Sequence, residues 1–533
     1  MSQADNSNAE ASPGSSSIAK TLLLTVTVLW CLYWYVHAWP YWEDDAYIHL
    51  EFARSVAAGQ GFAFNGHIVA GDTSPFWVFS LAGMHAFIPD WMIAGKSLAV
   101  LGAAVGFAGT YAFARRLARS QQLPGAALFP AAMVLLVAVN PFTCYWIFSG
   151  MEAFAAAGLA CFAVLAATSE VPSTGTFLIG CLLAGVTPLV RPEMTFLTLL
   201  LVFPLLAQWL RLPKSPVKFI LLVAGAVLVC APLAQWMLYS MHSFGHILPN
   251  TNAAKRAAPS RSIVSHLLTI YSLGVPLIVV GFCAGILALV FRASAVGRSI
   301  QRAIDATFQR DPPQDPRSLP LAGWIFIFWA CINTLFYIAN HTYVQTRYIL
   351  VTVPELTVVI LAVALAASRR AARALYVLAL LYSAMVSVVV VRPFIRNKGI
   401  NCGVERNLAV FIRDHVPPTA PVAVFGIGEI AFISQHPIVD TGGIMRPEAI
   451  PYLNAPHGEM ERWARSEGAQ YFMTSQPGPD AVLVFSEPLR VIGWTIHPSL
   501  YDDSYPIELW NLPPGASLFP PAGAPQPTQP ANE

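Results

Sequence analysis

Three acidic residues stand side by side where the first apolar run of the sequence ends. Glu43, Asp44 and Asp45 directly follow two aromatic residues and precede a further mostly apolar stretch. A carboxylate that is buried or lies beside another carboxylate has a raised pKa and can act as a general base towards a hydroxyl group. The neighbours Asp44 and Asp45 would also suit a divalent cation. The structural alternative is that these acids begin a helix, where the dipole favours negative charge.

A second group of charged residues flanks later apolar runs. Glu152 opens one run, and Arg191-Pro192-Glu193 lies between two others. These residues could bind a ligand through charge and hydrogen bonds. Equally, Glu152 could satisfy free amides at a helix start, and Pro192 could be the first helical residue with Glu193 in the first turn. The residues alone leave both interpretations open.

The composition limits what kind of chain can position these groups. Of 533 residues, 56% are hydrophobic and only 11% are charged, whereas ordinary soluble domains carry about 25% charged residues. We therefore exclude a water-soluble enzyme and a disordered chain, and predict a multi-spanning membrane protein. A net charge of +2 gives no sign of nucleic-acid binding. Most cysteines fall in apolar runs, and their spacing is neither a disulfide framework nor a zinc site.

Apolar runs recur throughout residues 19–391. A membrane helix needs about 20 mostly apolar residues, so the pattern predicts about 11 transmembrane helices. They are expected near 19–38, 93–114, 125–140, 150–168, 175–190, 194–210, 217–239, 264–292, 320–339, 347–367 and 373–391. We expect two juxtamembrane helices in the first outer loop, an amphipathic one after Asp44 and a short one at 75–88.

The placement of lysine and arginine predicts the orientation. The loops near 115–119, 211–218, 292–317 and 369–373 are richer in these residues than the loops that alternate with them. Because cytoplasmic loops hold the positive charge, the N-terminus is predicted to be cytoplasmic. Asp44, Asp45 and everything after about residue 392 are then extracytoplasmic.

The chain is predicted to contain two ordered regions and two tails. Residues 1–18 are expected to be a disordered cytoplasmic tail, and the Pro-rich residues 513–533 a disordered end. Within residues 392–512, two segments are typical of helices and four of strands, with turn residues between them. The predicted fold class is an all-α polytopic membrane domain at 19–391 with a small C-terminal α/β extracytoplasmic domain at 392–512.

An ordered set of motifs resembles the GT-C superfamily of integral membrane glycosyltransferases. The segments EDDAYI at 43–48, GQGFAFNG at 59–66 and GDTSPFW at 71–77 look like that family's first outer loop. SGME at 149–152, LVRPE at 189–193, LPNT at 248–251 and RYIL at 347–350 follow in the same order. The closest likeness is to actinobacterial arabinofuranosyltransferases and related uncharacterised bacterial enzymes. The chain departs from the usual pattern at Asp72, Ala153 and Met194.

The resemblance implies a bacterial plasma-membrane enzyme that takes a sugar from a polyprenyl-phosphate donor. The acceptor would be an extracytoplasmic glycan, lipid or protein, and the transfer would invert the anomeric centre. An Asp of the first outer loop is the base in such enzymes, which by position is Asp44 or Asp45. Cationic groups would stabilise the leaving lipid phosphate. The expected substrate-binding residues are Glu43, Glu152, Arg191, Glu193, Asn250, Thr251, Lys255, Arg256, Tyr343 and Arg347.

Several alternatives remain at this point. The outer arginines, including Arg261, could instead lie at phospholipid headgroups, and Tyr343 could belong to an interfacial aromatic belt. A transporter or lipid flippase is a second functional class, but it needs ionisable residues near the middle of the bilayer, and the predicted spans have almost none. A third possibility is an inactive membrane protein that binds glycan. No cofactor is required by the motifs, and a divalent cation at Asp44 and Asp45 stays open.

Overall fold

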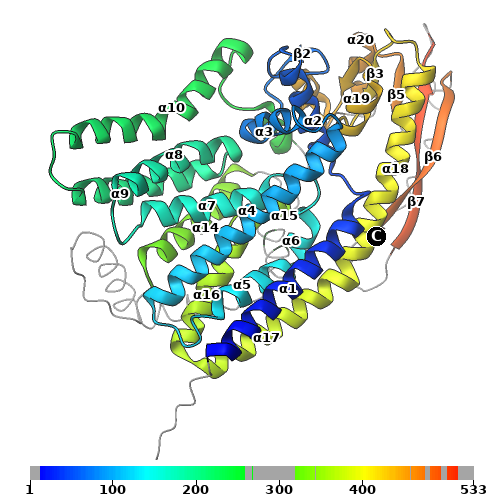
Figure 1. Cartoon of the computed structure of the whole chain (residues 1–533). Helices are drawn as coiled ribbons and strands as arrows, with labels where there is room; N and C mark the ends of the chain where they lie inside the picture. Colours follow the sequence, from blue (N-terminus) through cyan, green and yellow to red (C-terminus); the bar gives the residue numbers. More distant parts are fainter. Residues whose placement is uncertain are drawn as a thin grey trace, which may run out of the picture. The chain divides into compact units, whose positions relative to one another are not determined.

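The protein is mostly helical, with a small C-terminal sheet (Figure 1). The computed structural model describes residues 13–257, 267, 270, 319–341, 344–455, 458–473, 480–493 and 501–513. The predicted fold class, a helical polytopic membrane region followed by a small α/β region, is confirmed. The predicted span at 264–292 lies outside the described residues.

Six helices of the described residues are long and apolar enough to cross a membrane. They are α1 (Pro13–Ala38), α4 (Trp91–Ser120), α9 (Met194–Arg211), α10 (Lys218–Phe244), α14 (Leu321–Asn340) and the stretch Ala372–His415, which comprises most of α17 (Arg369–Val386), the π-helical η1 (Ser387–Val391) and α18 (Arg392–His415). Four shorter apolar helices are α5 (Phe129–Ala138), α7 (Ala153–Ala167), α8 (Thr174–Val190) and α16 (Val353–Ala367). The short helices α6 (Pro141–Trp146) and α15 (Thr346–Leu350) precede α7 and α16.

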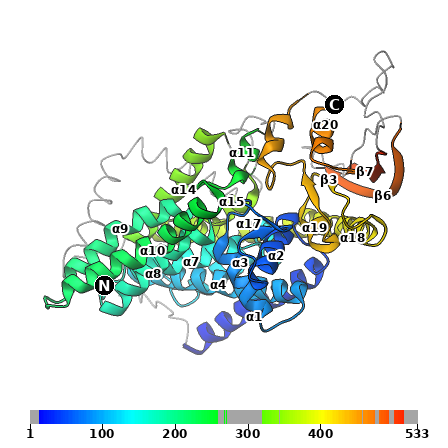
Figure 2. The same ribbon diagram turned by 90° about the horizontal axis from the view of Figure 1, so that it is seen from above.

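The chain divides into two compact units, each built from separate parts of the sequence. Unit 1 comprises residues 1–39, 92–237 and 261–393, and unit 2 comprises 40–91, 238–260 and 394–533. In unit 1, α8 packs against α7 and α9, and α14 packs against α9 (Figure 2). Small residues permit the closest approaches, as expected for helices that pack in a membrane.

One such approach joins α4 and α7. A methyl group added at Gly158 would overlap the main-chain oxygen of Val105 and lie 2.7 Å from the Cα atom of Gly106. A methyl group at Gly109 would lie 2.6 Å from the main-chain oxygen of Gly158. The backbones of the two helices therefore touch where glycine leaves room.

Unit 2 begins with the first loop of the chain. It contains α2 (Asp44–Ala57), the small hairpin β1 (Ala63–Phe64) and β2 (His67–Ile68), and α3 (Pro75–His85). The helix α11 (Asn250–Ala257) comes from the middle of the sequence. Both predicted juxtamembrane helices are present as helices, and they pack against each other.

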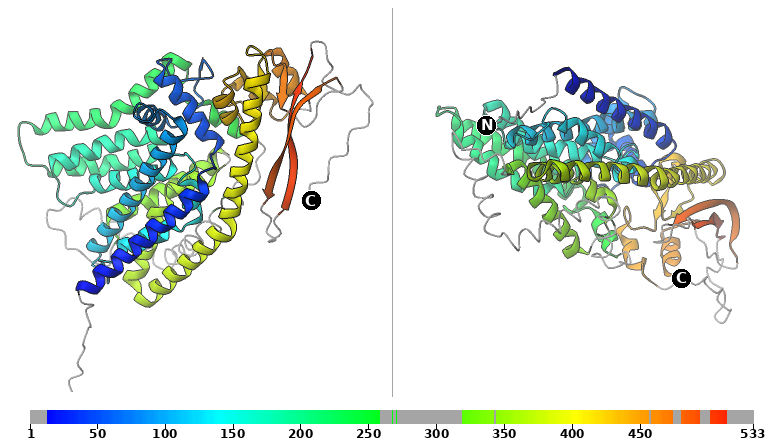
Figure 3. Two further views of the ribbon diagram at one scale, coloured as in Figure 1. Left: turned by 45° about the vertical axis from the view of Figure 1, so that its right-hand side comes forward. Right: turned by 90° about the horizontal axis from the view of Figure 1, so that it is seen from below.

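The C-terminal part of unit 2 contains a mixed five-stranded sheet, as far as the structure describes it. The strands are β3 (Val422–Val424), β4 (Ile438–Asp440), β5 (Tyr471–Met473), β6 (Val482–Gly493) and β7 (Tyr501–Asn511), in the order β4-β3-β5-β7-β6. β4 and β5 run parallel to β3, whereas β7 is antiparallel to both β5 and β6. The long β6–β7 ribbon is visible in Figure 3.

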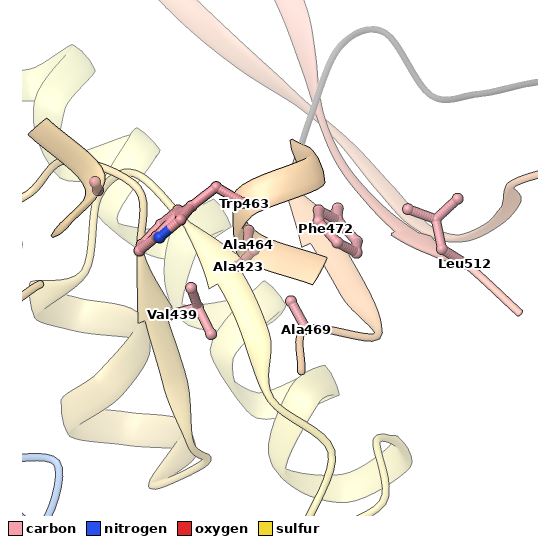
Figure 4. Close-up of a cluster of buried hydrophobic side chains, with 8 residues drawn as sticks. Ala423, Val439, Trp463, Ala464, Ala469, Phe472 and Leu512 are labelled. Carbon is pink, nitrogen blue, oxygen red and sulfur yellow. The ribbon is translucent and has the colours of Figure 1, made fainter. Parts of the chain in front are cut away.

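Helices cover this sheet and complete its core. They are α19 (Gly428–Ser434), the 3-10 helix η2 (Pro447–Tyr452) and α20 (Glu459–Ser466). Figure 4 shows the core side chains Ala423, Val439, Trp463 and Phe472, which are all buried, from β3, β4, α20 and β5. The ring of Trp463 stacks on that of Tyr452, with centroids 5.8 Å apart. The parallel strands that precede and follow α19 are thus fixed by an apolar cluster.

Candidate functional site

The three predicted acids lie at the start of α2, but the side chain of the N-cap residue does not cap the helix. Glu43 is the N-cap residue, and its side chain makes no capping hydrogen bond. Its carboxylate instead accepts a hydrogen bond of 2.6 Å from the hydroxyl of Tyr41. Asp44 and Asp45 form the first turn of α2. Asp44 Oδ1 accepts a hydrogen bond of 3.0 Å from the backbone amide of Glu429, at the start of α19.

The surroundings of Asp44 shift its proton affinity into the neutral range. Burial raises the pKa of Asp44 to about 7, and the negative charges of Asp45 and Glu43 act in the same direction. Hydrogen bonds from the amides of Glu429 and Gly428 oppose this rise by stabilising the ionised form. The residue remains partly exposed, so an acceptor hydroxyl can approach it.

Glu429 forms a second acidic centre beside Asp44. Its Oε1 atom accepts a hydrogen bond of 2.9 Å from the hydroxyl of Tyr47, and Arg406 lies 3.2 Å from the same oxygen. Arg406 also donates to the Tyr47 hydroxyl at 2.9 Å. The Oε2 atom is buried with no hydrogen-bond partner among the described residues. Burial raises the pKa of Glu429 to about 7, and Asp44 adds to the rise, whereas Arg406 and Tyr47 lower it.

The polar side of α2 is buried, which differs from the interfacial amphipathic helix that the sequence predicts. His49 Nδ1 forms a buried pair with Asp72, and Glu51 pairs with Arg54. Glu51 Oε1 also accepts from the backbone amide of Asn65 at 3.3 Å. Hydrophobic spacing alone could not show that loops from the same unit would supply partners for these polar groups.

The loop at 70–74 connects two of the sequence motifs. Thr251 donates from its hydroxyl to the main-chain oxygen of Gly71 at 2.7 Å, and the amide of Asn250 donates to the oxygen of Ala70 at 2.9 Å. Asp72 in turn accepts from the amide of Ser74 at 2.6 Å. Asn250 and Thr251 therefore hold the loop in place. Further along α11, Lys255 is half-buried and Arg256 is exposed.

Unit 1 contains a buried ion-pair cluster around Arg191. Its guanidinium lies 2.5 Å from Glu152 Oε1 and 2.7 Å from Glu193 Oε1. Burial lowers the pKa of Arg191, but the carboxylates of Glu193 and Glu152 outweigh it and raise the pKa above its usual value, so the residue stays charged. Neither glutamate caps a helix with its side chain. The alternative in which Pro192 is the first helical residue does not hold, because α9 begins at Met194 and Glu193 is its N-cap residue.

Arg347 lies close to this cluster, in α15. It is buried, and its guanidinium lies over the rings of Trp146 and Tyr348, 5.4 Å from each centroid. Arg191 also lies over Tyr348, at 5.1 Å. Unit 1 thus gathers two guanidinium groups, two carboxylates and two aromatic rings.

Two ionisable residues of the apolar helices in unit 1 are buried, and both lie near the start of a helix. Glu355, in the first turn of α16, is fully buried and accepts a hydrogen bond of 3.3 Å from Cys161. Lys96 of α4 is also buried, and its ammonium group donates to the main-chain oxygens of Ala38 and Phe148. The ammonium group of Lys96 therefore has main-chain partners in unit 1, whereas Glu355 Oε2 is buried without a hydrogen-bond partner among the described residues.

The predicted site residues fall in different parts of the molecule. Glu43, Asp44, Asp45, Asn250, Thr251, Lys255 and Arg256 belong to unit 2, and Glu152, Arg191, Glu193 and Arg347 belong to unit 1. Tyr343 and Arg261 lie outside the described residues. That the acids and cations share one pocket stays a prediction.

The sequence interpretation missed the contribution of the C-terminal region. Gly428 and Glu429 begin α19, and nothing in the neighbouring sequence connects them to Asp44. Among the described residues, no group of three or more His, Cys, Asp or Glu side chains could hold a metal ion.

Comparisons with known proteins give the following likenesses. Residues 395–516 match a family model described as "Domain of unknown function (DUF8728)". No curated protein matches the chain. The fold is similar to ArnT from Cupriavidus metallidurans bound to undecaprenyl phosphate, with 12% identity, a TM-score of 0.49, and coverage of 85% of this chain and 96% of that chain.

Two further solved structures are similar over much of the chain. The Archaeoglobus fulgidus oligosaccharyltransferase has 12% identity and a TM-score of 0.46, with 85% of this chain and 69% of that chain covered. The arabinofuranosyltransferase AftD from Mycobacteria has 13% identity and a TM-score of 0.46, with 92% of this chain and 40% of that chain covered.

Proposed function

We propose that this protein is a GT-C glycosyltransferase in which Asp44 is the general base. It transfers a sugar from a polyprenyl-phosphate donor to a hydroxyl group of an extracytoplasmic glycan, lipid or protein. The observation that carries the proposal is the state of Asp44: a partly exposed carboxylate, oriented by backbone amides, with a pKa of about 7. A base whose pKa lies near the working pH is the most efficient.

The reaction is a single displacement with inversion. Asp44 removes the proton of the acceptor hydroxyl as its oxygen bonds to the anomeric carbon of the sugar. The bond between that carbon and the phosphate oxygen breaks, and its electron pair leaves with the polyprenyl phosphate. The proton then passes from Asp44 to water.

Charge develops on the phosphate as it leaves, and cationic groups stabilise it. Within unit 1, the charge of Arg191 is already balanced by two glutamates. We assign the phosphate to Arg347, whose buried guanidinium lies over the rings of Trp146 and Tyr348. Lys255 and Arg256 of α11 are the candidates in unit 2 for contacts to the sugar or the lipid phosphate.

The test compares the two neighbouring aspartates. Membranes containing Asp44→Asn or Asp45→Asn are supplied with radiolabelled polyprenyl phosphates that carry arabinofuranose or a hexose, and transfer to endogenous acceptor is measured. Loss of a general base lowers the rate by about 10²- to 10⁴-fold, so the transfer rate of Asp44→Asn should fall at least about 100-fold. Asp45→Asn should retain most of the transfer. Wild-type rates in both variants would refute the base assignment.

A further inference from the structure

We propose that Gly428 and Glu429, at the start of α19, are positioning residues for the base Asp44, so that the C-terminal region completes the catalytic machinery. This inference rests on the proposed function of Asp44. It assigns a role to residues 395–516, which match a family model without a described function.

A hydrogen bond joins the start of α19 to the carboxylate of Asp44. The amide of Glu429 donates to Asp44 Oδ1 at 3.0 Å, and the amide of Gly428 adds to the stabilisation of the ionised carboxylate. Two amides from successive residues fix the direction in which a carboxylate points. The orientation of the Asp44 carboxylate is thereby set by a contact between residues that are 385 positions apart in the sequence.

There is no room for a side chain at Gly428, because α19 lies directly against Asp44 there. A methyl group there would overlap the main-chain oxygen of Asp44 and lie 2.7 Å from Oδ1. Only glycine permits this approach of α19 to α2. At Gly426, two residues earlier, an added methyl would meet no atom within 4 Å. The chain thus provides a matched pair of glycines, one against the base and one in open space.

Two further side chains of α2, Tyr47 and Arg54, hold α19 against α2. Tyr47 of α2 donates to Glu429 Oε1 at 2.9 Å. Arg54, two turns further along α2, donates to the main-chain oxygen of Phe432 at 3.0 Å and lies over its ring. These contacts hold the start of α19 at a fixed place beside Asp44. The position of the amides is therefore built into the packing of the two helices.

The charges around Asp44 determine whether its pKa rises or falls when an amide donor is removed. The negative charges of Asp45 and of the N-cap residue Glu43 disfavour ionisation of Asp44. An ionised Asp44 in turn repels the carboxylates of Glu429 in α19 and Glu405 in α18. The cations nearby are Arg406, which pairs with Glu429, and Lys398, which acts on Glu405. In these acidic surroundings the two amides favour the charged form. Removing an amide donor should therefore raise the pKa of Asp44.

The test removes one donor and keeps everything else matched. Glu429→Pro lacks the N–H group, and proline is tolerated in the first turn of a helix. Glu429→Ala lacks the same carboxylate but keeps the N–H group. In full-length protein in detergent, labelling of Asp44 by dicyclohexylcarbodiimide, which reacts with protonated carboxyl groups, is followed against pH by tandem mass spectrometry.

The midpoint pH for Asp44 labelling should be higher in Glu429→Pro than in Glu429→Ala by about one pH unit. A hydrogen bond to a charged group is worth about 1.5–3 kcal/mol, and a shift of one pKa unit equals about 1.4 kcal/mol. The acidic limb of the transfer rate should move up by the same amount. Equal midpoints would overturn the proposal.

The glycine pair supplies the second variant. Gly428→Ala should lose at least tenfold in kcat, whereas Gly426→Ala should transfer sugar at the wild-type rate. Wild-type kcat in Gly428→Ala would also overturn the proposal. If the wild-type protein transfers no sugar from any donor while the labelling midpoints differ as expected, the proposed function fails and the positioning of Asp44 by α19 stands.

Discussion

Asp44 and Asp45 are adjacent in sequence but have different roles in the site that we propose. Asp44 points to the start of α19 and accepts a backbone hydrogen bond there. Asp45 raises the pKa of Asp44 through its charge. The sequence indicated that one of this pair is the base, but it could not select between them, because the selecting partner lies in the last third of the chain.

The Arg191 cluster leads to a prediction about stability. Replacing Arg191 with Met removes the cation that pairs with the buried Glu152 and Glu193, which should lower the free energy of unfolding by about 3–5 kcal/mol. Thermal unfolding of the purified protein in detergent measures the effect. The matched control is Arg115→Met, because Arg115 is exposed on α4.

Adding Glu152→Gln and Glu193→Gln to the Arg191→Met variant should recover part of the lost stability, because the stranded charges are then gone. An unchanged melting temperature in Arg191→Met alone would mean that the cluster does not stabilise the fold. The sequence left the structural and ligand-binding interpretations of these residues equally open. Their mutual pairing now favours the structural one for Arg191.

Among the elements, the helices were the most predictable. Long apolar runs identified α1, α4, α9, α10 and α14, since burial in lipid demands a continuous apolar stretch. The strands β3 to β6 were also expected from alternating or apolar segments. The segment that forms β7 was not predicted, because it is polar over much of its length and is a strand by virtue of pairing with β5 and β6.

The close contact of α4 and α7 yields a prediction at this scale. Gly158→Ala should force the two backbones apart, because the new methyl overlaps the oxygen of Val105. Overpacking of this kind costs about 1–3 kcal/mol, which a lower melting temperature in detergent would report. Gly83→Ala in α3 is the control, since no atom lies within 4 Å of its added methyl. Equal stability of the two variants would contradict the close packing.

At the scale of the whole molecule, the orientation in the membrane is a prediction from charge placement. In spheroplasts, a membrane-impermeant maleimide should label Ser486→Cys in intact cells, because β6 is expected to be extracytoplasmic. Arg370→Cys should be labelled only after permeabilisation. Both positions are exposed to solvent or lipid in the structure. The opposite pattern would place Asp44 in the cytoplasm and rule out an extracytoplasmic acceptor.

The assembly of unit 2 from three separate stretches of sequence has a consequence for biosynthesis. Asp44 leaves the ribosome long before Gly428 and Glu429 have been translated, so the nascent chain carries its acid without the amides that orient it. Under the proposed function, a product that terminates early would contain several of the apolar helices but would be unable to transfer sugar. Under the same proposal, transfer requires that the last part of the polypeptide has been translated and has folded against the first loop.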